Sequence, residues 1–213
     1  MTNTLTGKVA FVTGPARGIG EAVARALAAR GARLSLVGME PERLASLAAE
    51  LGGGHAWFEC DVTDQAALER AVSGTGAALG GIDVVVANAG IGSFGTVSVT
   101  PLEAQVRVIE VNLIGVLRTV AATLPPVTAR RGYYLLVSSA AALAPGPGLA
   151  AYAASRAGSS SSATRCAWSW PAKAWASASR ILVGSTPTSC ATPGRISAPS
   201  TRSCGACPDP WAS

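Results

Sequence analysis

The stretch Thr13-Gly14-Pro15-Ala16-Arg17-Gly18-Ile19-Gly20 decides the fold, because an apolar run precedes it and a helix-like segment follows it. The run at residues 9–12 is typical of a buried strand, and residues 21–30 have a helix-forming composition. In chain order, its glycines permit a tight turn, a close backbone approach to a pyrophosphate, and close packing of helix on strand. The helix N-terminus offers free N–H groups to phosphates. The stretch predicts a dinucleotide-binding turn, with an ordinary glycine-rich turn as the alternative.

Strand and helix signals alternate along the chain after this turn. Further apolar runs, predicted as parallel strands buried on both faces, lie at residues 34–37, 56–60, 84–87 and 133–137. Helix-like segments lie between them, at residues 41–51, 64–79 and 101 to about 128. The last helix has a strong start signal, with Thr100 predicted as N-cap, Pro101 as first residue and Glu103 as third. This alternation predicts an α/β, Rossmann-like doubly wound parallel sheet.

Length and composition fit one α/β domain or a domain with an appendage. The chain has 213 residues, 49% of them hydrophobic, which is enough for a sizeable core. No apolar run reaches the roughly 18 residues of a membrane span, and the polar residues 1–8 lack a signal-peptide core. We therefore expect a cytoplasmic protein without a membrane partner. The net charge of +5 arises almost entirely from residues 159–213, without a basic groove, so we expect no nucleic-acid partner.

Residues 159–213 differ in composition from the rest of the chain. They contain four of the five Trp, four of the five Cys and thirteen Ser, but one Leu and no Glu. We predict a Rossmann-type NAD(P)-binding domain at residues 1–158 and an aberrant Ser/Trp/Cys-rich tail at residues 159–213, which leaves the C-terminal part of the fold incomplete or irregular. A disordered tail is one interpretation, although four Trp and few charges are unusual for disorder. A Cys-rich module is another, but Cys204 and Cys207 form a lone CxxC, so we predict no metal site.

A shifted reading frame explains more of this tail. Plausible codons for residues 159–190, regrouped by one nucleotide, encode VEQLGNALRLELAGKGVGVGVA, and VDTDIVRD follows further on. The longer segment has the pattern of an amphipathic helix, a glycine turn and a Val-rich strand. Those are the next elements that a doubly wound domain needs. We therefore predict that the tail is a frameshift product that begins near Gly158.

Several ordered motifs over the first 158 residues resemble the short-chain dehydrogenase/reductase family. Beyond the glycine turn, these motifs are Asp61-Val62, Asn88-Ala89-Gly90, Asn112, Ser139 and Tyr152, which together span about three quarters of the chain. The resemblance implies an NAD(P)-dependent oxidoreductase that interconverts an alcohol and a ketone by hydride transfer. The alternative is a catalytically inactive remnant that at most binds a dinucleotide or a protein partner.

For the cofactor, the resemblance implies contacts from the ends of three strands. The implied residues are Thr13, Gly14, Arg17, Gly18, Ile19 and Gly20 in the turn, Asp61 and Val62 near the adenine, and Asn88, Ala89 and Gly90 after the fourth strand. Asp61 could instead cap a helix beside Thr63 and Asp64, and Asn88-Ala89-Gly90 could be a plain strand-terminating turn.

For catalysis, the resemblance implies that Ser139 polarises the substrate carbonyl and that Tyr152 is the general acid/base; Ser138 is a competing choice that spacing disfavours. A free phenol has a pKa of about 10, so a nearby cation must stabilise its phenolate. The family has Lys four residues after the Tyr, where this chain has Arg156, which keeps the charge but is bulkier. Asn112 resembles the family residue that holds a water in the proton relay; an Asn on the polar edge of a helix is the alternative.

The segment after the second strand favours NADP, with NAD possible. NAD-preferring enzymes end this strand with an acid that binds the ribose, but here Gly38 and Met39 come first and Glu40 is late. Arg17 could pair with a 2′-phosphate. The single histidine, His55, is predicted to be structural. The expected partner is a small-molecule alcohol or carbonyl substrate, and the homo-oligomer typical of the family is in doubt here because of the tail.

The end of the regular pattern bears on stability. Residues 133–137 are predicted as an exposed apolar edge strand unless the short apolar run at residues 180–183 pairs with it. Several buried aliphatic side chains, at roughly 1.5–3 kcal/mol each, would then be missing from the cover of the sheet. We therefore expect a poorly soluble or partly unfolded chain, which a monodisperse sample melting cooperatively above about 55 °C would contradict.

Overall fold

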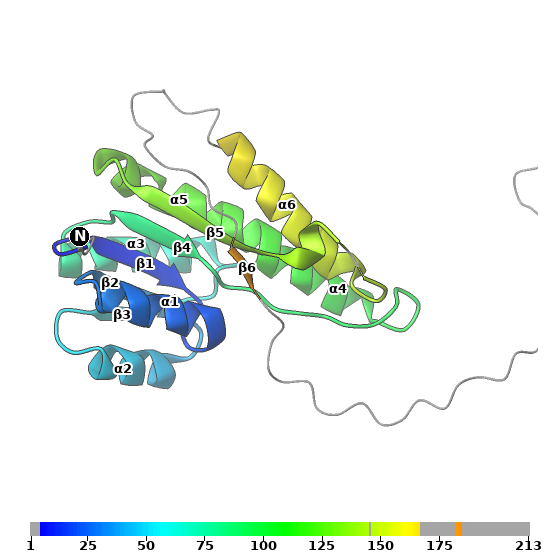
Figure 1. The fold of residues 1–213 in the computed structure, drawn as a ribbon, viewed down its shortest axis with the longest axis horizontal. Coiled ribbons are helices and arrows are strands. Elements are labelled where there is room, and N and C mark those ends of the chain that lie inside the picture. Colours follow the sequence, from blue (N-terminus) through cyan, green and yellow to red (C-terminus); the bar gives the residue numbers. More distant parts are fainter. Residues whose placement is uncertain (1–4, 145, 167–181, 185–213) are drawn as a thin grey trace, which may run out of the picture.

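The computed structural model describes residues 5–144, 146–166 and 182–184, which form a six-stranded sheet with helices. The strands are β1 (Val9–Thr13), β2 (Arg33–Gly38), β3 (Ala56–Glu59), β4 (Val84–Ala87), β5 (Tyr133–Ser139) and β6 (Leu182–Gly184). The helices are α1 (Gly18–Ala28), α2 (Pro41–Glu50), α3 (Gln65–Leu79), α4 (Leu102–Ile109), α5 (Gly115–Ala129) and α6 (Ala150–Cys166). All pairings are parallel in the order β3-β2-β1-β4-β5-β6 (Figure 1), so the predicted doubly wound α/β fold is confirmed.

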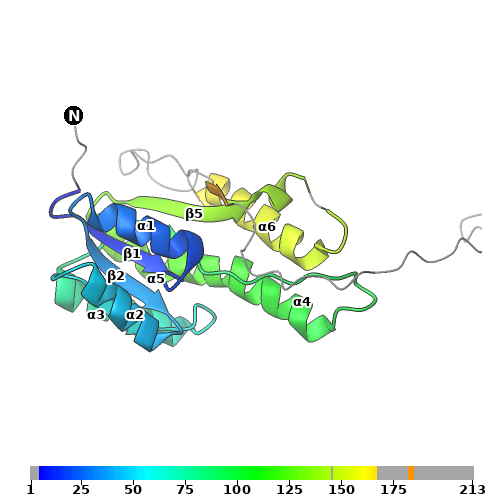
Figure 2. The same cartoon turned by 60° about the horizontal axis from the view of Figure 1, so that its bottom comes forward.

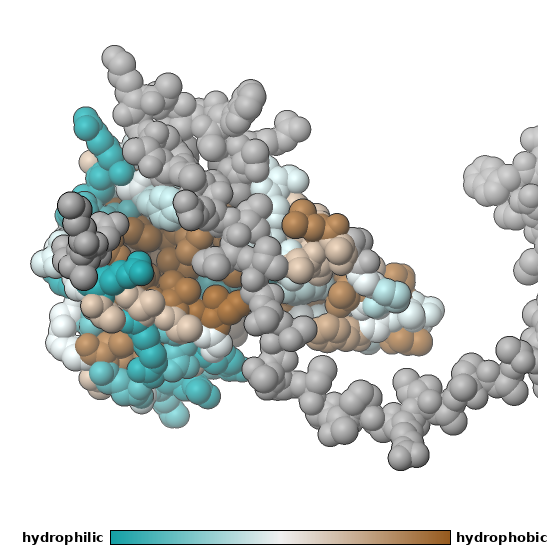
Figure 3. Space-filling model, viewed as in Figure 1, coloured by the Kyte–Doolittle hydropathy of each residue, from teal (hydrophilic) through white to brown (hydrophobic). Residues whose placement is uncertain are grey.

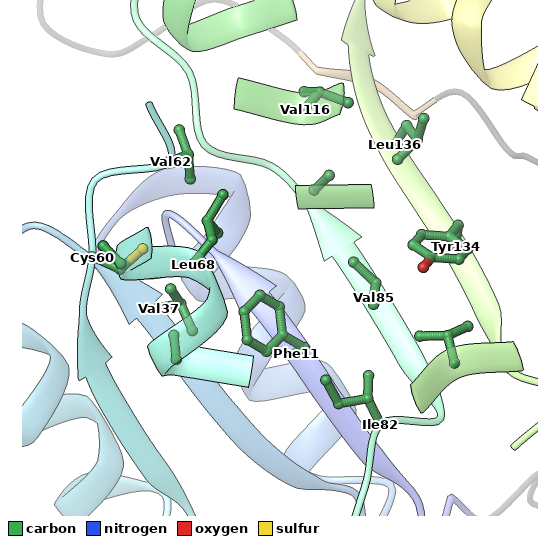
Figure 4. Packing of buried hydrophobic residues seen from close by; sticks show 14 of the residues in the cluster. Phe11, Val37, Cys60, Val62, Leu68, Ile82, Val85, Val116, Tyr134 and Leu136 are labelled. Atoms are coloured by element: carbon green, nitrogen blue, oxygen red, sulfur yellow. The ribbon is translucent and has the colours of Figure 1, made fainter. Parts of the chain in front are cut away.

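Two apolar clusters fill the space between the sheet and its helices. One cluster packs α3 and α5 against the sheet around Phe11, Leu68 and Val85 (Figure 4). The other packs α1 and α2 against the opposite face through Ala24 and Leu44. The two clusters explain why β1 is buried along its whole length. Figure 2 shows α1 and α2 side by side, and α4 and α6 extending beyond the sheet at its carboxyl edge.

Two local sequence predictions are wrong. The strand β3 alternates between half-buried and exposed residues, and Trp57 and Glu59 are exposed, because β3 is the outermost strand of the sheet that the described residues form. The helix α4 begins at Leu102 with Pro101 in the capping position, and no side chain caps it. Thr100 is therefore not the N-cap, since proline fixes the backbone of the capping residue instead.

The helix after β4 is long and contains an irregular turn. A π-helical segment at Glu110–Ile114 connects α4 and α5 into a continuous helix of 28 residues, Leu102–Ala129. By length and composition alone this helix could cross a membrane, but a helix that packs on the core of a soluble protein passes the same test. Its α5 part packs against the sheet through Val116 and Val127.

The predicted exposed edge of the sheet is wrong in part. The strand β6 pairs with β5, with Leu182 opposite Val137 and Gly184 opposite Ser139. Of the run at residues 180–183, which the sequence offered as the strand-like material of the tail, Leu182 and Val183 take part in this pairing, and Gly184 follows them. The predicted boundary after Gly158 also lies inside α6, which continues to Cys166. Residues 167–181 and 185–213, including the CxxC at Cys204, lie outside the described residues.

Candidate active site

The glycine turn lies between β1 and α1, and hydrogen bonds connect it to the residues at the end of β4. Asn88 donates from Nδ2 to the carbonyl oxygens of Gly14, at 2.9 Å, and Thr13, at 3.2 Å. The hydroxyl of Thr13 accepts from the backbone N–H groups of Asn88, at 3.0 Å, and Ala89, at 3.1 Å. The carboxyl ends of β1 and β4 are thereby held together, which is where ligands bind in open α/β sheets.

The glycines of this turn meet different constraints. Gly14 and Gly18 have positive φ angles of 65° and 58°, which favour glycine. A Cβ at Gly20 would overlap the carbonyl oxygen of Gly14 and lie 2.5 Å from Asn88 Nδ2, whereas a Cβ at Gly18 would meet nothing within 4 Å. Gly20 is therefore required by packing. The space over Gly18, at the N-terminus of α1, fits a pyrophosphate that approaches the backbone.

Arg17 and Glu40 form an ion pair beside this turn. Arg17 precedes α1, and Glu40 is the residue before α2, so the pair connects the ends of β1 and β2. Glu40 Oε2 is buried without a hydrogen-bond partner among the described residues. The sequence analysis predicts that Glu40 lies too late in the chain to bind the ribose; that stays a prediction, and the structure shows Glu40 paired with Arg17.

Asp61 and Val62 follow β3 in a short loop. The carboxylate of Asp61 accepts hydrogen bonds from Thr63 N and Oγ1, both at 2.8 Å, and from Arg107 Nη2 at 2.7 Å. Burial raises the pKa of Asp61, but these hydrogen bonds outweigh burial and lower the pKa below its ordinary value. Val62 is buried against α5. The cap of α3 is Asp64, whose carboxylate accepts from Ala67 N at 3.1 Å, so Asp61 is not the helix cap.

Asn112 lies in the π-helical segment and is fully buried. It accepts from Ile91 N at 2.8 Å and donates from Nδ2 to Ile91 O, at 2.9 Å, and to Ser155 Oγ, at 3.2 Å. The backbone carbonyl oxygen of Asn112 accepts a hydrogen bond from Ser159 Oγ at 2.8 Å. Asn112 therefore ties the loop after β4 to α6, and π turns of this kind are frequent at functional sites.

Ser138 and Ser139 at the end of β5 have different surroundings. Ser138 is buried and donates to Arg156 O at 3.2 Å, so its hydroxyl points toward α6. Ser139 is half-buried, and its hydroxyl accepts from Ala141 N at 3.2 Å. The structure thus leaves Ser139 as the serine of this pair that borders the loop at the carboxyl edge, in line with the spacing argument.

Tyr152 and Arg156 lie one turn apart on α6. The guanidinium carbon of Arg156 is 5.4 Å from the centre of the Tyr152 ring, within the range of a cation–π contact. Arg156 is buried and donates from Nη1 to Val137 O at 3.1 Å, while its Nε has no partner among the described residues. A Cβ at Gly90 would overlap Arg156 Nη2, so the guanidinium fills the space between β4, β5 and the tyrosine ring.

Four residues that make contacts in this region were not predicted from the sequence. Arg107, Ser155 and Ser159 make the polar contacts described above, and Ile91 provides the backbone groups that Asn112 binds. No local signal identifies Arg107, since its partners are 44 and 46 residues away along the chain. His55 is structural as predicted, because its Nδ1 accepts from Leu34 N at 3.0 Å. The described residues contain no group of three or more His, Cys, Asp or Glu side chains that could hold a metal ion.

Comparison with known proteins agrees with this geometry. A family model of the short chain dehydrogenases matches residues 8–189, so the chain belongs to this family. It is 39% identical over 160 residues to (−)-isopiperitenol/(−)-carveol dehydrogenase of Mentha piperita, covering 72% of this chain and 60% of the relative. It is 40% identical over 114 residues to D-threitol dehydrogenase of Mycolicibacterium smegmatis, covering 52% and 44%. The chain thus spans about half the length of these relatives.

A solved structure supports the same assignment. An alcohol dehydrogenase of the archaeon Thermococcus sibiricus, complexed with 5-hydroxy-NADP, superimposes with a TM-score of 0.72 and is 34% identical. The match covers 75% of this chain and 69% of that enzyme. The similarity therefore extends over most of the described sheet.

Proposed function

We propose that this chain is, or derives from, an NAD(P)-dependent oxidoreductase that interconverts an alcohol and a ketone. The observation that carries the proposal is the meeting of three strand ends at one edge: Asn88 joins β1 to β4, and Arg156 joins β5 to the helix of Tyr152. The glycine turn, Ser139 at the end of β5 and Tyr152 on α6 all lie at this edge, which supports the proposal. Membership of the short chain dehydrogenase family and the named dehydrogenases among its relatives support the proposal.

The residues present fit a nicotinamide dinucleotide. The open backbone at Gly18 and the N-terminus of α1 would hold the pyrophosphate, Asp61 and Val62 would border the adenine, and Asn88-Ala89-Gly90 would border the other half. When bound, such a cofactor supplies the acceptor or donor of a hydride.

The chain's own residues would handle the oxygen and its proton. The hydroxyl of Ser139 would donate a hydrogen bond to the substrate oxygen and orient it, and the phenol of Tyr152 would exchange the proton with that oxygen. Arg156 would stabilise the negative charge on Tyr152 from the ring face, where the guanidinium already lies. This is a different contact from an ammonium at the phenol oxygen, and it separates this chain from the pattern that has Lys.

The cofactor we propose is NADP, with NAD as the competing choice. Arg17 can offer its guanidinium to a ribose 2′-phosphate, and the Thermococcus sibiricus relative was solved with an NADP analogue. Glu40 opposes this preference because it already pairs with Arg17. The substrate we propose is a small alcohol or carbonyl compound, and the location we propose is the cytoplasm without membrane or nucleic-acid partners.

One observation favours a second candidate, a remnant that binds a dinucleotide without turning over substrate. The guanidinium of Arg156 donates a hydrogen bond to Val137 O and lies over the ring of Tyr152. It also fills the space beside Gly90. In that arrangement the cation is not available to contact a ribose. A remnant would keep the cofactor site and lose proton transfer.

Two measurements separate these candidates. Loss of NADPH absorbance with a panel of ketones measures turnover, and calorimetric titration with NADPH and NADH measures binding. The oxidoreductase predicts turnover that Tyr152→Phe lowers by about 10²–10⁴-fold with binding retained. Binding without turnover supports the remnant, and a folded chain that binds neither dinucleotide overturns both.

A further inference from the structure

A ring of hydrogen bonds holds the loop after β3 against α4. Arg107, near the end of α4, donates from Nη2 to Asp61 Oδ2 at 2.7 Å and from Nη1 to Thr63 Oγ1 at 2.9 Å. Thr63 donates from its N and Oγ1 to Asp61 Oδ1, both at 2.8 Å. The three side chains form a closed ring between two elements far apart in the sequence.

The ring leaves one acceptor position on Asp61. A carboxylate has about four lone-pair sites, two on each oxygen. The described contacts occupy both sites of Oδ1 and one site of Oδ2. The side chain of Asp61 is 27% exposed, and Arg107 is the one donor to Oδ2 among the described residues. Asp61 also follows the carboxyl end of β3, where the proposed adenine would lie.

The exposure of the pair decides what Arg107 contributes. The Arg107 side chain is 45% exposed, and ion pairs that open to solvent contribute little to folding stability. The planar fork of a guanidinium, however, fixes the direction of the groups that it bridges. The main consequence of the contact is therefore the orientation of the Asp61 carboxylate.

We propose that Arg107 is a positioning residue for the adenine end of the dinucleotide. It holds the carboxylate of Asp61 so that the free site of Oδ2 faces the amino group of the nucleobase, and Thr63 completes the ring. This inference rests on the proposed dinucleotide binding. It gives a role to a residue that has no place in the sequence motifs.

The test compares Arg107→Gln with the full-length chain by calorimetric titration. ADP probes the adenine end and nicotinamide mononucleotide probes the other end. Arg107→Gln should raise the Kd for ADP about tenfold, because a charge-assisted contact that orients the acceptor is lost, and should leave nicotinamide mononucleotide unchanged. Arg107→Lys should fall in between, since a compact ammonium cannot bridge both acceptors. Arg118→Gln is the matched control, because Arg118 pairs with Glu110 at 3.2 Å, away from Asp61.

The outcomes distinguish this inference from the proposed function. If the original chain binds ADP and Arg107→Gln binds it equally well, the positioning role is wrong while the dinucleotide site stands. An equal loss for both probes also overturns it, because a local role affects one end. If the original chain binds neither dinucleotide nor ADP, the proposed function fails and this inference with it. Should Arg107→Gln lose its circular dichroism signal, Thr63→Val opens the same ring and should raise the Kd for ADP about threefold; unchanged affinity contradicts the proposal.

Discussion

The turn after β1 and the first turns of α6 border the same edge of the sheet, but they are stabilised differently. Around the turn, Asn88 and Thr13 satisfy backbone groups on two strands, and the required glycine at position 20 packs against them. In α6, the guanidinium of Arg156 is buried with a carbonyl partner and an Nε without one among the described residues. A buried charge without a carboxylate partner is costly. The comparison implies that the proposed dinucleotide binding and the proposed proton transfer depend on separate parts of the chain, so one can be lost without the other.

The two halves of the sheet also differ in how far helices cover one of its faces. Helices α1 and α2 lie over β1 and β2, whereas no helix of the described part lies over β4 and β5 on that face (Figure 1). Figure 3 shows hydrophobic surface there, and Val84 and Leu135 are partly buried only. The short pairing of β6 covers the edge of β5 but not this face. Among the residues that the structure describes, the second half of the sheet therefore lacks the apolar cover that the first half has.

The largest expected effect comes from repairing the α6 region. Arg156→Lys alone should restore little turnover, because we expect the residues after Gly158 to be needed to complete the substrate side of the fold. Correcting the reading frame after Gly158 together with Arg156→Lys should raise the rate of NADPH oxidation by about 10²–10⁴-fold, the range of general acid–base catalysis. A frame-corrected chain that keeps Arg156 is the matched control. Comparable turnover in the original and the doubly changed chain would show that neither Arg156 nor the altered sequence after Gly158 impairs turnover.

The predicted frameshift has its own test, which is to resequence the gene across the codons for residues 156–160.

The glycine turn offers a sharper test of the first region. Gly20→Ala should lower the free energy of unfolding by about 3 kcal/mol, because its Cβ would overlap the carbonyl of Gly14. Gly18→Leu should cost about 1–2 kcal/mol through its positive φ angle and should weaken NADPH binding more than tenfold by obstructing the pyrophosphate. Urea unfolding and calorimetric titration measure the two quantities. If a soluble Gly18→Leu sample binds NADPH as well as the original chain, the assignment of the turn is wrong.

A smaller effect is expected at the entrance between β1 and β2. Glu40→Gln removes the charge that pairs with Arg17, so Arg17 becomes available to a 2′-phosphate. The ratio of NADP to NAD affinity should rise about tenfold, which corresponds to about 1.4 kcal/mol. Glu42→Gln, two residues further on and exposed, is the control and should leave the ratio unchanged. A ratio that does not change in Glu40→Gln would exclude Arg17 as the residue that selects the cofactor.

Sequence patterns predicted most of the first region because its signals are local. The glycine turn, the strand before it and the helix after it are adjacent in the chain, and the structure reproduces them within a few residues. The four strands predicted after it also form, since short apolar runs between turns are typical of buried parallel strands. The strand β3 also forms, but it is not buried on both faces, because its short apolar run was equally compatible with a position at the edge of the sheet.

The site contacts that sequence reasoning missed are all between distant residues. Arg107 looks like any exposed arginine on a helix, and its function depends on a loop 46 residues earlier. The pairing of Arg17 with Glu40 depends on the directions of two strand ends, which a linear count from β2 does not provide. The burial of Arg156 against Gly90 requires three elements to meet. Motifs therefore predicted which residues take part in the site, and the structure shows which side chains and backbone groups those residues contact.

The smallest expected effect concerns pH and the Arg107–Asp61 contact. The folded-state pKa of Asp61 is lowered, so its contribution to stability is present above the unfolded pKa of about 3.9 and is lost as the pH falls through the folded pKa. Arg107→Gln removes one of the lowering contacts and should reduce the free energy of unfolding by about 0.5 kcal/mol at pH 6, and the difference should disappear as the pH falls through the folded-state pKa of Asp61. Glu59, Asp64 and Arg70 are charged groups close to Asp61 in sequence or space, and both chains keep them; burial raises the pKa of Cys60 to about 11, so that thiol is neutral throughout.

Urea unfolding of both chains at pH 6, 4.5 and 3 measures this difference, and a repeat in 1 M NaCl should shrink it, because the pair is open to solvent. A difference that is the same at all three pH values would mean that Arg107 acts through packing and not through the charge of Asp61. In that case the orientation of the carboxylate would not depend on the guanidinium. The loop after β3 would then be held against α4 by side-chain packing and not by the Arg107–Asp61 ion pair.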